Sequence, residues 1–269
     1  MDSNWIDLSA IVATWPKDDL GWSISPGIPG CVLGPRIKVF GGGVRTKEGV
    51  RIKEGVCIGE GVCIGLGADI GERVSIGPQA NIGEWASIGA LVRIAEHANI
   101  GVGAYVGERA RIGAHANIGT MVDIGEGTEV DSLTRINSRS KIRESVQIGS
   151  QASIGEGTYI YRQAVVGSLA CIGNYCLIEE ETRIDNCSSI GADARIGPRS
   201  FGARDIGYAD GYRKCIACVG DVAYIGAGCR WFTLNTALEH WAHKPDRAVT
   251  MALMESAKAI ANLNGWKWG

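Results

Sequence analysis

Arginine and histidine side chains recur at intervals of 18 residues in the middle of this 269-residue chain. Six of them form three pairs whose members lie 18 or 36 residues apart: Arg93 and Arg111, His97 and His115, and Arg73 and Arg109. Arginine presents planar donors to phosphate and carboxylate groups, and histidine transfers protons near neutral pH. If the fold stacks residues that are 18 apart, these side chains converge on a site that binds an anion and moves a proton.

A strict six-residue repeat provides such stacking. Every sixth residue from Ile52 to Ile196 is Ile or Val, 25 times without an insertion or deletion, and a small residue stands two positions before each. A period of six fits neither a helix nor an alternating strand, and is typical of a solenoid built from short strands and tight corners. Echoes every 18 residues, such as 93–101 against 111–119, indicate three strands per coil. We expect the aliphatic residues to fill the coils, and the glycines that follow them to relax the corner backbone.

This repeat resembles the hexapeptide-repeat family, the left-handed parallel β-helix of bacterial acyltransferases. The resemblance covers residues 44–200. It implies an all-β solenoid of about eight or nine triangular coils of 18 residues with a left hand. It also implies a homotrimer packed along the prism faces, with a histidine near the subunit interface that deprotonates an acceptor amine or hydroxyl. The fold hosts several activities, so the function has to be argued from the surface residues.

Two segments flank the repeat region, which we place at residues 31–201. Residues 1–30 show no six-residue register and are predicted to cap the first coil, whose strand edges and apolar core would otherwise be exposed. Residues 202–269 are predicted to form a hairpin from 214–219 and 222–225, followed by helices over 233–243 and 247–263. The stretch Gly228–Thr233, with Ala237 and His240, resembles the ending of uncharacterised hexapeptide-repeat proteins of phages and prophages.

The composition excludes several classes of protein. The chain is 45% hydrophobic with a net charge of −2, so it has no global attraction to nucleic acid or to an anionic membrane. The basic residues of the run 135–143 fall on different faces of the coil, which also disfavours nucleic-acid binding. The first residues lack the features of a signal peptide, and no apolar run reaches the ~18 residues of a membrane span. Nine scattered cysteines form no disulfide framework, so we expect a cytoplasmic protein.

Outward positions of the coils define the candidate site. We expect His97 or His115 to act as the catalytic base. The predicted anion- or substrate-binding residues are Arg73, Arg93, Arg109, Arg111, Asn99 and Asn117. The alternative is a solvated face, because glutamates adjoin several of the basic residues and because stacked asparagines can form a structural ladder of amide hydrogen bonds.

Large apolar residues also fall at outward corners, where they gain little from the core. The predicted contacts with neighbouring chains are Trp85, Met121 and Tyr175 in one column and Leu133 and Leu169 in another.

No metal site is predicted. A γ-type carbonic anhydrase, another occupant of this fold, requires three metal-binding histidines across a trimer interface, and the repeat region contains two, in one column. Cys215 and Cys218, with Cys229 and His240, have the composition of a zinc site. However, Cys215 and Cys218 are an odd number of residues apart on an expected strand, so their side chains point to opposite faces. Ordinary core cysteines are the favoured interpretation.

Two functions remain. The first is a non-enzymatic, phage-related scaffold that presents the coil faces and the C-terminal appendage to a protein partner. It is favoured because the unbroken register leaves no inserted loop to shape a substrate pocket. The alternative is a CoA-dependent acyltransferase with a histidine base at a trimer interface. No resident cofactor is predicted, and acyl-CoA is the co-substrate if the alternative holds.

Overall fold

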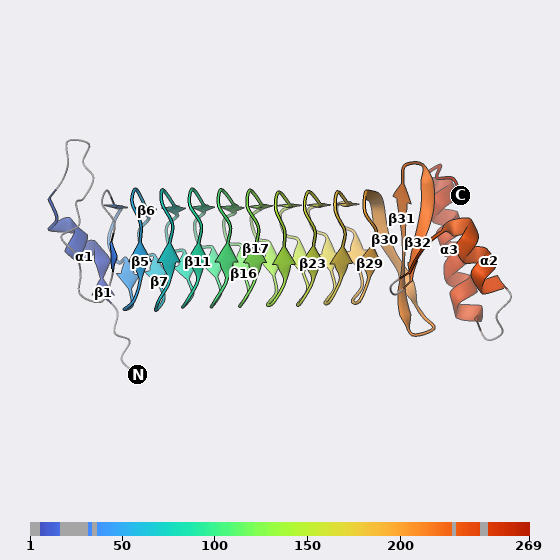
Figure 1. Cartoon of the computed structure of the whole chain (residues 1–269), viewed down its shortest axis with the longest axis horizontal. Coiled ribbons are helices and arrows are strands. Elements are labelled where there is room, and N and C mark those ends of the chain that lie inside the picture. Colours follow the sequence, from blue (N-terminus) through green and yellow to red (C-terminus); the bar gives the residue numbers. More distant parts are fainter. Residues whose placement is uncertain (1–5, 17–31, 34–36, 228–229, 243–246) are drawn as a thin grey trace. The chain divides into compact units, whose positions relative to one another are not determined.

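A computed structural model describes residues 6–16, 32–33, 37–227, 230–242 and 247–269. The chain forms two compact units, residues 1–145 and 146–269, which are described in turn. Both units contain the predicted coils of short parallel strands (Figure 1). Among the described residues, β3–β29 are two-residue strands, and at three strands per coil they make about nine coils.

The first unit begins with one short helix and continues as strands. Its elements are β1 (Ile6–Asp7), α1 (Leu8–Ala13), β2 (Val32–Leu33), β3 (Lys38–Val39), β4 (Arg45–Thr46), β5 (Arg51–Ile52), β6 (Cys57–Ile58), β7 (Cys63–Ile64), β8 (Asp69–Ile70), β9 (Ser75–Ile76), β10 (Asn81–Ile82), β11 (Ser87–Ile88), β12 (Arg93–Ile94), β13 (Asn99–Ile100), β14 (Tyr105–Val106), β15 (Arg111–Ile112), β16 (Asn117–Ile118), β17 (Asp123–Ile124), β18 (Glu129–Val130), β19 (Arg135–Ile136) and β20 (Lys141–Ile142).

From β4 onward each strand pairs in parallel with the strand one coil away, and residue n faces residue n+18. Asn81 pairs with Asn99, and Arg93 pairs with Arg111. The second residue of each strand from β5 to β20 points inward and is buried, whereas the first points outward. The small residue two positions before the aliphatic is buried as well, as predicted. Where it is a hydroxyl residue, the hydroxyl finds a backbone acceptor, since Thr128 Oγ1 donates to the carbonyl of Arg143 at 2.8 Å.

The start of the chain lies against the first coils. β1 pairs antiparallel with β4, and the backbone N–H of Leu8 donates to the carbonyl of Val44 at 2.9 Å. Leu8 and Val12 of α1 are buried, and so is Trp15. These contacts cover one end of a strand column that would otherwise expose unpaired backbone groups. The boundary of a cap at residue 30 stays a prediction, because residues 17–31 lie outside the described residues.

Glycine serves the coils for a different reason from the one expected. The corner residues with left-handed backbone stand three positions after the aliphatic and include many that are not glycine, such as Trp85 (φ 59°) and His97 (φ 55°). The glycines directly after the aliphatic residues stand where the next coil leaves little space for a Cβ. A Cβ added to Gly113 would lie 2.5 Å from the carbonyl carbon of Asp131 in the next coil. Close approach of backbones, rather than a free φ, therefore places most of these glycines.

The second unit begins with coils of the same kind and then changes architecture. Its coil strands are β21 (Gln147–Ile148), β22 (Ser153–Ile154), β23 (Tyr159–Ile160), β24 (Val165–Val166), β25 (Cys171–Ile172), β26 (Leu177–Ile178), β27 (Arg183–Ile184), β28 (Ser189–Ile190) and β29 (Arg195–Ile196). An antiparallel sheet and two helices follow: β30 (Ser200–Ala209), β31 (Tyr212–Val219), β32 (Val222–Ala227), β33 (Arg230–Thr233), α2 (Leu234–Ala242) and α3 (Ala248–Leu263).

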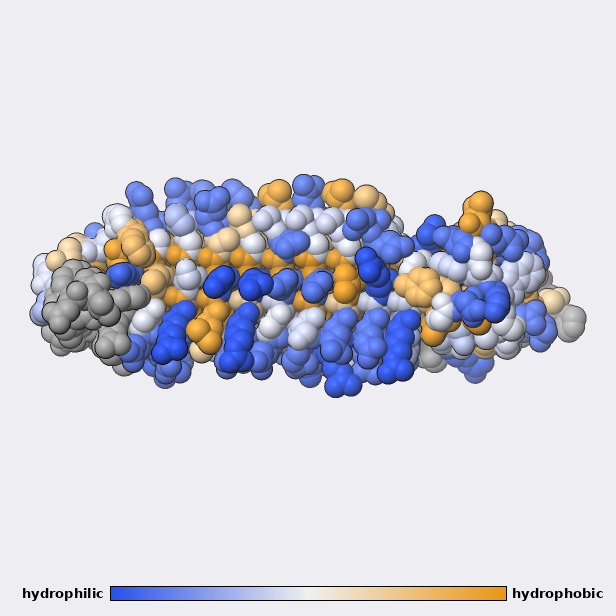
Figure 2. Space-filling model, turned by 90° about the horizontal axis from the view of Figure 1, so that it is seen from above, coloured by the Kyte–Doolittle hydropathy of each residue, from blue (hydrophilic) through white to orange (hydrophobic). Residues whose placement is uncertain are grey.

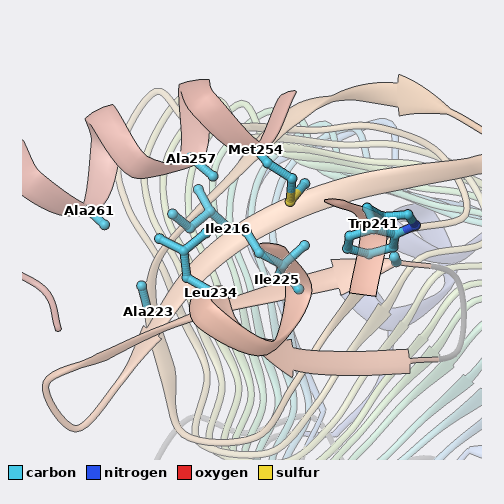
Figure 3. Close-up of a cluster of buried hydrophobic side chains, with 10 residues drawn as sticks. Ile216, Ala223, Ile225, Leu234, Trp241, Met254, Ala257 and Ala261 are labelled. Atoms are coloured by element: carbon cyan, nitrogen blue, oxygen red, sulfur yellow. The ribbon is translucent and has the colours of Figure 1, made fainter. Parts of the chain in front are cut away.

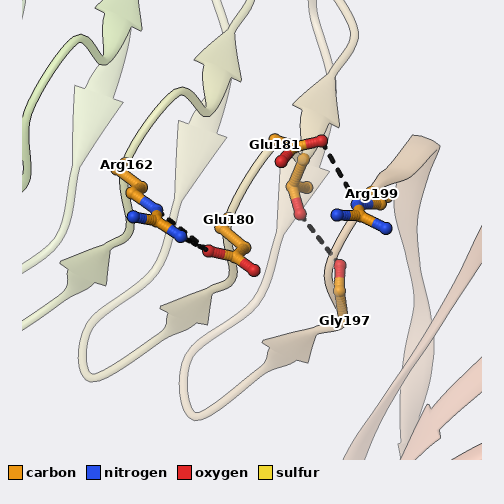
Figure 4. A network of polar contacts seen from close by, with 6 residues as sticks. Arg162, Glu180, Glu181, Gly197 and Arg199 are labelled. Atoms are coloured by element: carbon orange, nitrogen blue, oxygen red, sulfur yellow. Dashed lines mark hydrogen bonds and ion pairs between the residues drawn. The ribbon is translucent and has the colours of Figure 1, made fainter.

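Polar contacts in this unit connect successive coils (Figure 4). Arg162 Nε donates to Glu180 at 3.0 Å, and Arg199 Nε donates to Glu181 at 3.2 Å. Inside the coil, the Thr182 hydroxyl donates to the carbonyl of Gly197 at 2.8 Å. The ion pairs are exposed and each contributes roughly 0–1 kcal/mol. The buried hydroxyl bond satisfies a polar group that water cannot reach.

The four-stranded sheet packs on the last coil and carries the helices on its other side. β31 and β32 contact β29, and a Cβ added to Gly197 would lie 2.8 Å from the Trp231 indole. Ile216, Ile225, Leu234, Trp241 and Met254 form the centre of the core between sheet and helices (Figure 3). The sheet thus closes the coil on one face and builds a small α+β layer structure on the other.

The predicted hairpin and both predicted helices are confirmed, and the Thr233 hydroxyl accepts from the N–H of Thr236 at 3.2 Å, as an N-cap does. The predicted ββαα appendage is wrong in its strand number, because β30 and β33 were not expected. β30 pairs with β31 through two register shifts, which interrupt the alternation of inward and outward residues by which a strand is found in sequence. The predicted left-handed β-helix is confirmed.

Candidate functional site

The two solenoid histidines form a parallel stack on one corner of the first unit. Their ring centroids are 4.7 Å apart and their planes differ by 6°. This separation matches the ~4.8 Å spacing of paired strands, so the coil itself sets the distance between the rings. Both residues have left-handed backbone, and both side chains are exposed. Among the described residues no carboxylate hydrogen-bonds to either ring, so the imidazole nitrogens are accessible to a substrate.

An open groove of about 570 Å³ lies on the face that precedes this corner. It runs over β9, β12, β15 and β18, and its charged lining residues are Arg93, Arg111, Glu129 and Asp131. Gly77, Ala95 and Gly113 follow the aliphatic residues of β9, β12 and β15. Because these residues have little or no side chain, they leave the space that forms the groove. His97 and His115 follow the lining residues Ala95 and Gly113 by two positions and are not themselves part of the lining.

The structure does not bring the four predicted arginines together as free cations. Arg109 forms ion pairs with Glu108 at 3.2 Å and with Glu126 at 2.9 Å, and Arg111 forms one with Glu129 in the groove. The side chain of Arg73 leans onto Gly55 of the preceding coil, where an added Cβ would lie 3.2 Å from its Cγ. Arg93 lines the groove and forms no ion pair with any described residue. Arg93 is therefore the arginine of this set best placed to meet an anion.

The predicted asparagine ladder is present on the face that follows the histidines. Asn81 Nδ2 donates to Asn99 Oδ1 at 2.8 Å, and Asn99 Nδ2 donates to Asn117 Oδ1 at 3.1 Å. The ladder engages one amide N–H of Asn99 within the protein. A role of Asn99 and Asn117 in binding an anion stays a prediction.

The outward apolar residues are exposed on both units. Trp85 and Met121 in the first unit are 62% and 63% exposed, and Tyr175 in the second is 61% exposed. Leu133 and Leu169 are exposed as well. The Trp85 ring lies against Gly67 of the preceding coil, which holds the indole flat on the corner. Figure 2 shows hydrophilic side chains projecting from the coils in rows, with hydrophobic residues visible between the rows.

The cysteines of the C-terminal sheet are core residues in the described part of the chain. Cys215 and Cys218 are buried on β31, and burial raises the pKa of the Cys218 thiol. Cys229 lies outside the described residues. No group of three or more potential metal ligands occurs among the residues that the structure describes. None of the described helices is long and apolar enough to cross a membrane.

Comparison with solved structures finds several proteins with a similar fold. LpxA from Acinetobacter baumannii is 18% identical, with a TM-score of 0.42 over 71% of this chain and 70% of LpxA. A UDP-N-acetylglucosamine acyltransferase is 15% identical, with a TM-score of 0.41 over 76% of this chain and 72% of that protein.

The acetyltransferase domain of PglB from Neisseria gonorrhoeae, in complex with acetyl coenzyme A, is 21% identical over 39% of this chain, with a TM-score of 0.34. The chain spans about half the length of that domain, 52%. No protein-family model and no curated protein matches the sequence.

The chain has the hexapeptide-repeat β-helix fold. At these identities the likeness extends to the fold alone. The expected non-enzymatic scaffold is not supported, because the similar structures that were found are acyltransferases. The alternative, a CoA-dependent acyltransferase, stays a proposal. The similar structures also give no support to the protein partner expected at the C-terminal appendage. The resemblance to phage proteins stays a prediction.

Proposed function

We propose that the protein is an acyltransferase that moves an acyl group from coenzyme A to an amine or hydroxyl, with His97 or His115 as general base. The observation that carries this proposal is the exposed, parallel pair of imidazoles, which follow the groove residues Ala95 and Gly113 by two positions, together with the open groove that Arg93 lines. A general base has to reach the proton that it removes. These rings are exposed, and no protein group occupies their nitrogens among the described residues.

In the proposed reaction an imidazole nitrogen accepts the proton of the acceptor O–H or N–H. The acceptor atom attacks the thioester carbonyl carbon, and the C–S bond then breaks. The thiolate of coenzyme A leaves and takes the proton from the imidazolium, so the base is regenerated. Arg93 meets a phosphate of the donor through charge-assisted hydrogen bonds, whereas Arg109 and Arg111 are already paired with glutamates.

The unbroken register affects how the site is completed. From Ile52 to Ile142, all of it described, the strands of the first unit follow one another every six residues without an inserted loop, and the groove is open to solvent along one face. A second copy of the chain can supply the missing wall. We infer that the protein assembles as a homotrimer through its exposed corner residues, with Trp85, Met121 and Leu133 contributing from the first unit and Leu169 and Tyr175 from the second.

The test uses acetyl-CoA and succinyl-CoA as donors, a panel of amine and hydroxyl acceptors, and the release of free thiol as the signal. Gln occupies the same corner position at residues 79 and 151 with the same positive φ, so His97→Gln and His115→Gln suit the local backbone. We expect the variant at the true base to lose roughly 10²–10⁴-fold in rate. Gln79→Ala, at the corner one coil before His97, is the matched control and should leave the rate unchanged.

Donor binding gives a second readout by calorimetry. Arg93→Gln should weaken acetyl-CoA binding roughly tenfold or more, and Arg109→Gln, which removes an arginine already paired twice, should change it little. A folded protein that neither binds these thioesters nor releases thiol from them would refute the proposal.

A further inference from the structure

A second pocket lies wholly within the second unit, between the C-terminal sheet and its two helices. Its volume is about 270 Å³, and it is lined by residues of β31, β32 and β33, of the turn before β31, of the end of α2 and of the start of α3. Lys214 on β31 pairs in register with Ala227 on β32, and Ala227 pairs with Arg230 on β33. The two basic residues therefore lie in one row across the sheet. The proposed acyl transfer makes no use of this pocket.

Lys214 places a charge in the wall of the pocket. Its side chain is 1% exposed, and its Nζ donates to the carbonyl of Ala209 at 2.6 Å and lies 3.9 Å from the Asp210 carboxylate. Burial lowers the pKa of Lys214, and the charge of Asp210 opposes that effect. A buried ammonium destabilises the fold unless it is paired and hydrogen-bonded, so the surroundings of Lys214 have to balance it.

Asp210 is shared between several donors. Arg247 Nη1 lies 2.6 Å from Asp210 Oδ1, while the Thr250 hydroxyl donates to Oδ2, the oxygen that also faces Lys214. Burial raises the pKa of Asp210, but the hydrogen bonds from Thr250 and Arg247 more than offset this and hold the pKa below its usual value. Asp210 is therefore ionised at neutral pH, and both of its oxygens are engaged within the protein.

The described lining of the pocket carries more positive than negative charge. Lys214 and Arg247 both form ion pairs with the carboxylate of Asp210. Arg230 forms no ion pair with any residue that the structure describes. Three basic groups and one carboxylate in the described lining leave a site that favours an anion. The planar fork of an arginine matches a carboxylate in two parallel hydrogen bonds.

Aromatic rings form the remaining wall. His240 stacks on Phe232 with centroids 5.3 Å apart, and Trp241 meets His240 edge to face at 5.1 Å. All three rings line the pocket. Such a wall offers flat, polarisable surface to a planar ring. The volume lies just below the ~300 Å³ lower end of small-molecule sites, which suits one ring with one small substituent.

We propose that this pocket binds a small aromatic carboxylate, with its carboxylate at Arg230 and its ring against Phe232, His240 and Trp241. The competing explanation is that Lys214, Asp210 and Arg247 only hold the helices on the sheet. That explanation gives no role to the exposed Arg230 and predicts no selective binding of such a ligand.

The test measures binding to the full chain by calorimetry, with benzoate as the probe. Acetate carries the charge without the ring, and benzylamine carries the ring with the opposite charge. We expect benzoate to bind at least tenfold more tightly than acetate, and benzylamine not to bind. Equal affinity for benzoate and acetate, or no benzoate binding, would overturn the proposal.

Variants place the ligand within the pocket. Arg230→Gln should weaken benzoate binding roughly tenfold to a hundredfold without changing the unfolding temperature, because Arg230 is exposed and outside the Asp210 network. Arg199→Gln removes an exposed arginine of the same unit that pairs with Glu181, and it should leave binding unchanged. If Arg230→Gln binds benzoate like the unmodified protein, or if Arg199→Gln weakens binding equally, the assignment to this pocket is wrong.

Discussion

Gly101 and Gly103 lie in one coil, and they test two reasons for which glycine can occur in this fold: close approach of neighbouring backbones and a positive φ. Gly101 follows the buried Ile100, and its φ is not positive. Gly103 has a φ of 63°, and a Cβ added there would meet only the Met121 side chain, at 3.8 Å. A Cβ added to Gly101 would lie 2.5 Å from the carbonyl carbon and oxygen of Gly119. Alanine at position 101 would therefore collide with backbone atoms of the next coil. Alanine at position 103 would be strained only by its positive φ.

The expected costs follow from these contacts. An ordinary Cβ contact begins near 3.4 Å, so Gly101→Ala requires the next coil to move by about 0.9 Å. Overpacking against backbone costs about 1–3 kcal/mol, and we expect the upper part of that range. The cost is finite, because Asn137 stands at the equivalent position two coils later. Gly103→Ala loses about 1–2 kcal/mol to a left-handed φ, partly offset by about 0.4–1 kcal/mol from a stiffer unfolded chain.

The assay is guanidinium unfolding of both variants, followed by far-UV circular dichroism. Because the gain from a stiffer unfolded chain applies to both variants, we expect Gly101→Ala to lower the free energy of unfolding by roughly 1 kcal/mol more than Gly103→Ala does. The two sites share a coil and a substitution, so differences in the unfolded chain largely cancel. If Gly103→Ala costs as much as Gly101→Ala or more, then backbone freedom rather than close approach explains the glycines.

Three further predictions concern the ladder, the corner and the appendage. Asn99 makes two ladder hydrogen bonds and Asn117 makes one, so Asn99→Ala should cost about 1–2 kcal/mol in urea unfolding and Asn117→Ala about half as much. Equal costs would show that the ladder adds no stability. Trp85→Ser should weaken self-association in sedimentation velocity, whereas Gln79→Ser, on a polar corner, should not; an unchanged assembly would remove Trp85 from the interface. The depressed pKa of Asp210 in the folded state contributes stability that is present above pH ~4 and is lost as the pH falls through the folded-state value. Thermal unfolding of Asp210→Asn should show a smaller acid-dependent loss than the unmodified protein, and an identical pH profile would contradict that account.

The coils could be predicted in detail because their register is local and periodic. An aliphatic residue every sixth position and a small residue two before it leave only one way to bury both, and the 18-residue echo places each side chain in a column. The asparagine ladder and the histidine stack follow from that arithmetic, since residues 18 apart stand one strand spacing apart. The hairpin and the helices of the appendage were predicted from turn and capping residues, which are also local signals.

The function was not predictable in the same way. The unbroken register favoured a scaffold, because it leaves no loop for a pocket, yet the flat face of the coils itself carries an open groove. The 18-residue spacing by which side chains were placed in columns also treated the four arginines as equivalent. It could not show that Arg109 and Arg111 pair with glutamates from neighbouring positions and coils, whereas Arg93 forms no ion pair with any described residue.

The sequence by itself determined the solenoid, its three-strand coil and the columns of outward side chains, because a period of six is imposed by packing within each coil. Only the tertiary structure decided how the glycines, the charges and the C-terminal sheet are used. Whether a glycine is needed depends on the distance to the next coil, and whether an arginine is free depends on where a glutamate side chain ends. The pocket around Lys214 is assembled from three strands, a turn and two helix ends. No periodic pattern in the sequence predicts this pocket, because its lining residues come together only when the sheet packs against the helices.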